Sequence, residues 1–332
     1  MKQRNNAFDL LCGLCILRMV TLHAICQTQL RGTTWWKETM AWTFFFMSFF
    51  FFKAGYFNKG ITCETLPYLK DRFRRLFVPY LSWGIIGGFM AIGWFCLYPE
   101  GPAKAVAVLR NFRWLVNGLT FGNSPLWFLL SFFATYVLMH FIERKRYLHW
   151  VVLLFPAVGY WLFLHGNPLW FYLNNVFCGI FFFYLGKVWH QILDKLTKHK
   201  ALLVSVLLFI GFVLANIFLH AEYEMKTNHW TGSFWNVLLI IPLSLLGISG
   251  ILFSLPTPRV PLINFIGEHS MVFFVMHNPI ILSYVHVCKL LGHNISKSIP
   301  DLIIILILSF TLCYVAVPFV ERVPWLSGRW KK

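Results

Sequence analysis

The sequence predicts an all-α, polytopic membrane protein with about ten transmembrane helices. Composition is the first observation behind this prediction: of the 332 residues, 58% are hydrophobic and only 12% are charged. A soluble domain carries about 25% charged residues, so this chain has too few to cover a water-facing surface. The second observation is the number of long apolar segments, because a bilayer core needs about 20 apolar residues per helix. Together they exclude soluble, disordered and disulfide-rich secreted proteins.

Ten segments are apolar and long enough to be predicted as spans, all within a single integral-membrane domain covering residues 1–332. In chain order the predicted spans are 7–26, 39–57, 76–98, 125–142, 148–165, 169–188, 201–220, 234–254, 264–286 and 302–320. Lys and Arg concentrate in alternate loops, a pattern typical of cytoplasmic loops, which places both termini in the cytoplasm. The same rule accounts for the formal net charge of +17 through contact with membrane lipids. A nucleic-acid partner is therefore not expected.

Ionisable groups within a span are costly to bury, so they are the first candidates for a functional site. The first span places Asp9, Cys12 and His23 within about 60° of one another on one helical face. His23 lies about 21 Å further along the helix than Asp9. Arg18 points about 140° away from His23 and needs a partner of its own.

The ninth span carries a second polar set, which includes Glu268, Ser270 and His277. His277 lies about 20 Å from the start of this span, so it is expected at the same depth as His23. Two imidazoles at one depth could flank a single cavity. Alternatively, each ring could simply form a hydrogen bond across two helices.

Two arginines precede the third span in the stretch YLKDRFRRLFVPY. Arg72 and Arg75 are three residues apart and are expected on one helical face. They could be ordinary cytoplasmic anchors, or they could form a guanidinium pair for an anion such as a nucleotide phosphate. Asp71 could instead neutralise one of them.

The order of these features resembles acyltransferase family 3, a family of integral-membrane enzymes that O-acylate extracytoplasmic glycans. The resemblance covers essentially the whole chain. The matching elements are FDLLCGLCILRMVTLHA with His23, FFFKAGYF with Gly55, Arg72-x-x-Arg75 before Pro79, Trp127-Phe128-Leu129, Tyr184-Leu185-Gly186 and IGEHSMVFFVMHNP with Ser270 and His277. One element departs from the family pattern: Cys12 stands where the family usually has Arg or Lys, and Arg18 lies on another face.

This resemblance implies a multi-pass protein of a bacterial plasma (inner) membrane. It implies that an acyl group, most simply acetyl, passes from cytoplasmic acyl-CoA to a hydroxyl of an extracytoplasmic polysaccharide, lipopolysaccharide or lipid-linked sugar. Acetyl-CoA is then a co-substrate, with no permanently bound cofactor and no metal expected, and the oligomeric state stays open. The first site residue is His23, as general base or, alternatively, as a nucleophile that forms an acyl-histidine. The others are Ser270, His277 and Trp127 as candidate oxyanion donors, Arg72, Arg75 and Asp9 at the donor entrance, and Arg18, Glu268 and Gly55 in support.

Two alternatives stay open at the level of the sequence. Buried histidines can relay protons in a transporter or flippase for a lipid-linked sugar or a small anion. A catalytically inactive relative would also fit, since Cys12 replaces a basic residue.

Overall fold

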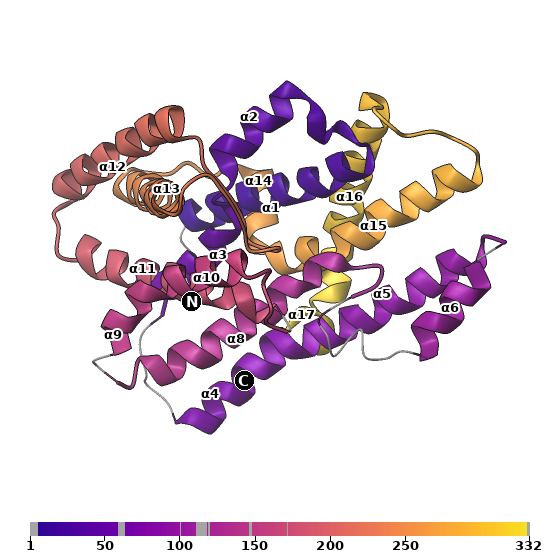
Figure 1. The fold of residues 1–332 in the computed structure, drawn as a ribbon, viewed down its shortest axis with the longest axis horizontal. Helices are drawn as coiled ribbons and strands as arrows, with labels where there is room; N and C mark the ends of the chain where they lie inside the picture. Colours follow the sequence, from indigo (N-terminus) through magenta and orange to yellow (C-terminus); the bar gives the residue numbers. More distant parts are fainter. Residues whose placement is uncertain are drawn as a thin grey trace. The chain divides into compact units, whose positions relative to one another are not determined.

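The part of the chain that the structure describes is predominantly helical, as predicted (Figure 1). A computed structural model describes residues 6–58, 64–99, 101–110, 118, 120–145, 148–170 and 172–330. Within these residues, eight helices are long and apolar enough to cross a membrane. The structure thus confirms an all-α polytopic membrane protein.

Seven of the eight long helices begin and end close to the predicted spans, but the helix predicted at 76–98 begins earlier, at Thr65. The eight helices are α1 (Asn6–Gln27), α4 (Thr65–Arg72) continuing through the π-helical turn η2 (Phe73–Phe77) into α5 (Val78–Cys96), η3 (Ser124–Leu126) with α8 (Trp127–Ile142), η5 (Leu173–Asn175) with α11 (Val176–Leu193), α12 (Lys198–Leu219), α13 (Phe234–Ser254), α15 (Ser270–Leu290) and α16 (Ile299–Val320). Polar caps fix several of their starts: Thr197, Ser233 and Ser298 each accept a hydrogen bond from a backbone N–H in the first turn. Such caps satisfy donors that the helix itself leaves unpaired.

Two predicted spans are broken in the structure, and a third is shorter than predicted. The span predicted at 39–57 is divided into α2 (Thr34–Thr43) and α3 (Phe46–Tyr56). The one at 148–165 forms the consecutive segments α9 (Leu148–Val151), η4 (Val152–Leu154) and α10 (Phe155–Leu164), which make one short apolar helix at His149–Leu164. The span at 264–286 becomes α14 (Pro261–Glu268) and α15, separated at His269. Hydropathy does not detect the break between Thr43 and Phe46, because the residues there stay mostly apolar. The break at His269 falls instead in the polar stretch of Glu268, His269 and Ser270. The remaining elements are η1 (Leu30–Gly32), α6 (Gly101–Arg110), the strands β1 (Glu222–Glu224) and β2 (His229–Thr231), which pair antiparallel, and α17 (Pro324–Ser327).

The chain divides into two compact units, and α1 passes from one to the other at Cys15–Ile16. The first unit comprises residues 1–15, 37–65 and 134–268. In it, α12 and α13 pack as an antiparallel pair joined by the β1–β2 hairpin (Figure 1). Its other main contact, between α3 and α11, depends on glycine: a Cβ at Gly55 would lie 1.7 Å from the Phe183 carbonyl oxygen, and one at Gly186 would lie 1.9 Å from that of Phe52.

Replacing Gly55 with Ala should therefore destabilise the protein. The added methyl group meets backbone rather than a flexible side chain, so α3 and α11 must separate, at a cost of about 1–3 kcal/mol. Thermal unfolding in detergent measures the change. Gly93→Ala in α5 is the matched control, since no heavy atom lies within 4 Å of its added Cβ. Equal melting temperatures for the two variants would contradict the close helix contact.

The second unit comprises residues 16–36, 66–133 and 269–332. Its centre is α15, which packs against α16, α5 and η3. Backbone carbonyls complete the packing of two further segments: Asn123 donates to the Val275 oxygen at 2.8 Å, and Trp83 donates to the Leu326 oxygen at 2.9 Å. This unit contains His23, Arg72, Arg75, Trp127, Ser270 and His277.

Candidate functional site

Two histidines from opposite ends of the sequence meet inside the second unit. The ring centroids of His23 on α1 and His277 on α15 are 5.0 Å apart, and the ring planes are inclined by 48°. His277 is fully buried and His23 is half-buried. The structure thus places the two rings together, as their equal expected depth predicted. Because α15 begins only at Ser270, His277 lies about 10 Å along its helix rather than 20 Å.

The hydrogen bond of His277 fixes which of its nitrogens can act. Nδ1 lies 3.0 Å from the Phe273 carbonyl oxygen. A carbonyl only accepts, so Nδ1 donates, and Nε2 of the neutral ring is left as an acceptor. Nε2 is buried and has no hydrogen-bond partner among the residues that the structure describes. This arrangement leaves His277 able to take up a proton or a hydrogen bond at Nε2, rather than to donate one.

The start of α8 lies next to this pair. Trp127 is buried as the first residue of α8. The neighbouring Phe128 ring is 5.4 Å from that of Phe274, and the Phe274 ring is 6.3 Å from that of His277. The Trp-Phe-Leu element is therefore brought to the His277 segment of α15. Ser270 begins the same helix two turns earlier, so about 10 Å along the axis separates it from His277.

Two asparagines beside the histidines were not identified from the sequence. Asn123 is fully buried, and while its amide nitrogen donates to Val275, its Oδ1 has no partner among the described residues. Asn278 follows His277 directly and donates to the Gly122 oxygen at 3.3 Å. Together they fasten the loop before α8 to the helix that carries His277. Neither side chain is ionisable, so neither stands out among the charged and titratable groups of the spans. The position of Asn278 directly after His277 was the one feature of the sequence that could have indicated it.

The two entrance arginines differ in their surroundings. Arg75 forms an ion pair with Asp71, with 2.7 Å between Nε and Oδ1, and both side chains are partly exposed. Arg72 lies over the Tyr68 ring, 5.0 Å from its centroid. The π-helical turn η2 begins between them, so their angular separation differs from that of an ideal α-helix. Asp71 thus neutralises one arginine, as one of the sequence alternatives allowed.

The basic charge expected near the start of α1 comes from a different helix. Cys12 is fully buried, and Lys53 of α3 donates to its sulfur at 2.8 Å, within the first unit. Lys53 belongs to the FFFKAGYF element, where it received no role from the sequence. Asp9, one turn before Cys12, is also buried. A cation therefore stands beside the position where the family resemblance expects Arg or Lys.

This contact predicts that Lys53 supplies the charge that Cys12 lacks. If the chain transfers acyl groups from acyl-CoA, as the family resemblance implies, Lys53→Met should lower the rate. Cys12→Lys in the same background should restore much of it, because the ammonium group returns to nearly the same place. Rates of transfer from labelled acyl-CoA by the two variants give the test. A double variant no more active than Lys53→Met alone would contradict the substitution of one cation for the other.

Two supporting residues have local partners. Glu268, the last residue of α14, pairs with Arg259 at 3.3 Å in the first unit. Arg18 is buried in the second unit with its guanidinium 4.9 Å from the centroid of the Trp36 ring. This cation–π contact is the partner that Arg18 was expected to need.

One group of side chains in the described residues could hold a metal ion: the ligand atoms of Cys288, His293 and Asp301 all lie within 4.8 Å of one another. The carboxylate of Asp301 is already bonded, to His293 Nε2 at 3.0 Å and to the Tyr284 hydroxyl at 2.5 Å. These hydrogen bonds have a structural role, because they connect the loop between α15 and α16 to both helices.

Comparison with known proteins decides the family. The Acyl_transf_3 family model, described as an acyltransferase domain, matches residues 5–317. The chain belongs to acyltransferase family 3. No curated protein and no solved structure matches it. Family membership makes the chain a membrane acyltransferase in the general sense.

Proposed function

We propose that this acyltransferase family 3 member transfers an acyl group, most simply acetyl, from cytoplasmic acyl-CoA to a hydroxyl of an extracytoplasmic glycan, in a plasma membrane. The observation that carries the proposal is the adjacent pair of the half-buried His23 and the fully buried His277. Placing two adjacent imidazoles within a membrane-spanning unit costs free energy, so their presence indicates a functional role. In an acyltransferase, that role is to move the proton of the acceptor hydroxyl.

The chemistry follows from the two rings. Neutral His23 takes the proton of the acceptor hydroxyl while the oxygen attacks the thioester carbonyl carbon. The tetrahedral intermediate then expels the CoA sulfur, the C–S bond breaks, and the imidazolium returns its proton to the thiolate. Nε2 of His277 accepts a hydrogen bond from the imidazolium of His23 and stabilises it during the transfer. This role replaces that of oxyanion donor, for which neutral His277 has no N–H available.

The donor is held by its charged end. The phosphates of coenzyme A cannot enter the hydrocarbon layer, so they stay at Arg72 and Arg75, where guanidinium groups make forked contacts with phosphate. About 20 residues of helix separate Arg75 from the end of α5, which is about 30 Å and close to the thickness of the bilayer core. The long, nearly uncharged pantetheine arm is the part of the donor that suits passage towards His23.

The decisive experiment offers labelled acetyl-CoA to the purified protein in detergent, with and without a glycan extract. Transfer of label to the glycan supports the proposal, and a parallel reaction with succinyl-CoA tests the acyl group. Mass spectrometry of surface glycans from cells with and without the gene gives the cellular counterpart, where loss of an acetyl-sized mass is expected. Loss of the whole polymer without any acyl-donor dependence would overturn the proposal.

A further inference from the structure

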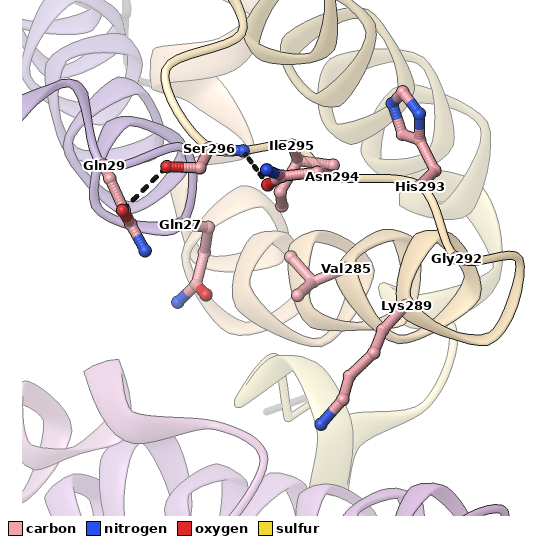
Figure 2. A pocket seen from close by; sticks show the side chains of 9 residues that line it. All are labelled: Gln27, Gln29, Val285, Lys289, Gly292, His293, Asn294, Ile295 and Ser296. Carbon is pink, nitrogen blue, oxygen red and sulfur yellow. Dashed lines mark hydrogen bonds between the residues drawn. The ribbon is translucent and has the colours of Figure 1, made fainter.

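A polar pocket of about 460 Å³ lies in the second unit, at the ends of the two helices that carry the histidine pair. Gln27, one turn beyond His23 on α1, lines one side, and Val285, two turns beyond His277 on α15, lines another. One helical turn is about 5.4 Å. Figure 2 shows Gln27 and Gln29 on one flank, Lys289 and His293 on the other, and the loop of Asn294–Ser296 between them.

The walls of this pocket are fastened in place. The Lys297 N–H donates to the Thr28 oxygen at 2.7 Å, and the Ser296 hydroxyl donates to the Gln29 side-chain oxygen at 2.8 Å, which joins the loop to the end of α1. Gln29 and Lys297 both have left-handed backbones, with φ of 56° and 57°. Residues other than glycine hold this conformation only where the surroundings impose it, often at functional sites. The loop that lines the pocket is therefore held in a defined conformation by these bonds.

The chemistry of the lining selects a class of ligand. Amide and hydroxyl groups of Gln27, Asn294 and Ser296 can both donate to and accept from sugar hydroxyls. Lys289 also lines the pocket, and its ammonium lies at the pocket's edge, 4.6 Å from the centroid of the Tyr98 ring. Among the described residues, the lining contains no carboxylate. The Asp301 carboxylate behind His293 is buried and already bonded. A concave site with one cation and no acid attracts an anion.

We infer that this pocket binds the acceptor, and that the acceptor is an anionic glycan whose carboxylate or phosphate is recognised by Lys289. The inference rests on the proposed function and narrows it, because it names the class of acceptor. The anionic group sits against Lys289, neighbouring hydroxyls bind the amides of the loop and of Gln27, and the hydroxyl to be acylated extends one turn inward to His23.

A pair of acceptors that differ only in charge gives the sharpest test. We expect the KM of the wild-type protein for an oligogalacturonate to be about fivefold lower than for its methyl ester, with the difference shrinking as salt rises. Lys289→Gln should remove the difference. Lys104→Gln, an exposed cation on α6 outside the pocket, should retain it. A phosphate-bearing oligosaccharide, offered in parallel, distinguishes the two sources of negative charge.

Equal KM values of the wild-type protein for acid and ester would overturn the inference, as would a Lys289→Gln variant that keeps the difference. Calorimetric binding of the same two oligosaccharides separates this result from failure of the proposed function. If no glycan is acylated but the acid binds more tightly and Lys289→Gln abolishes the preference, the pocket assignment stands and the proposed reaction is wrong. If transfer occurs without any charge preference, the reaction stands and the anionic acceptor is wrong.

Discussion

His23→Ala should reduce acyl transfer by about 10²–10⁴-fold, the usual contribution of a positioned general base. The half-buried ring of His23 lies beside the buried His277, and its removal takes away the group that acts as the base in the proposed mechanism. The rate of label transfer from acetyl-CoA to glycan measures the loss. His277→Ala should reduce the rate of acyl transfer by a smaller factor, because it removes the group that stabilises the His23 imidazolium rather than the base itself.

His199→Ala is the matched control, because His199 is exposed near the start of α12 and should tolerate the same truncation without effect on the rate. Folding of each variant is checked by its elution profile and melting temperature in detergent. A folded His23→Ala protein that transfers acyl groups at the wild-type rate would remove His23 from the mechanism. A result in which only His277→Ala abolishes transfer would exchange the roles of the two rings.

The sequence predicted the long helices, and offered the meeting of the histidines as one alternative, for simple geometric reasons. About 20 apolar residues reveal a span directly, and a fixed rise per residue converts positions on two helices into depths. Equal expected depth is the reason that the sequence offered a shared cavity for His23 and His277 as one of two alternatives. Their rings do lie together, with centroids 5.0 Å apart, although α15 begins later than the predicted span. The break between Thr43 and Phe46 was beyond this reasoning, because the residues across it remain apolar and only packing decides where such a helix ends.

Contacts between residues on different helices could not be predicted from the spacing of residues along the sequence. Lys53 and Cys12 lie on different helices, and nothing in the local pattern of either helix indicates that they meet. The hydrogen bond of His277 to a carbonyl of its own helix, which determines the available nitrogen, also depends on a rotamer rather than on sequence. The ion pair of Arg75 with Asp71 is the opposite case, since a separation of four residues on a helix predicted it as an alternative.

Substitution of Arg72 and Arg75 should have a large effect on the KM for the acyl donor. Arg75→Ala should raise the KM for acetyl-CoA about tenfold, and Arg72→Ala with Arg75→Ala should raise it further, because each variant removes charge-assisted bonds to phosphate. Asp71→Asn should lower the KM, since it releases Arg75 from a competing carboxylate 2.7 Å away. Initial rates at varied acetyl-CoA and saturating acceptor measure all three changes.

A truncated donor makes this test specific. S-acetyl-pantetheine lacks the nucleotide and its phosphates, so its KM should be high for the wild-type protein and unchanged by the arginine substitutions. Arg110→Ala, an exposed arginine at the end of α6, is the control for a general effect of lost positive charge. If Arg72 and Arg75 only anchored the helix to the membrane surface, both donors would respond alike, and Asp71→Asn would not improve the use of acetyl-CoA. The proposal thus expects Asp71→Asn to lower the KM and Arg75→Ala to raise it, and expects both changes only with the donor that carries the nucleotide. This combination indicates that the guanidinium groups act on the nucleotide part of the donor.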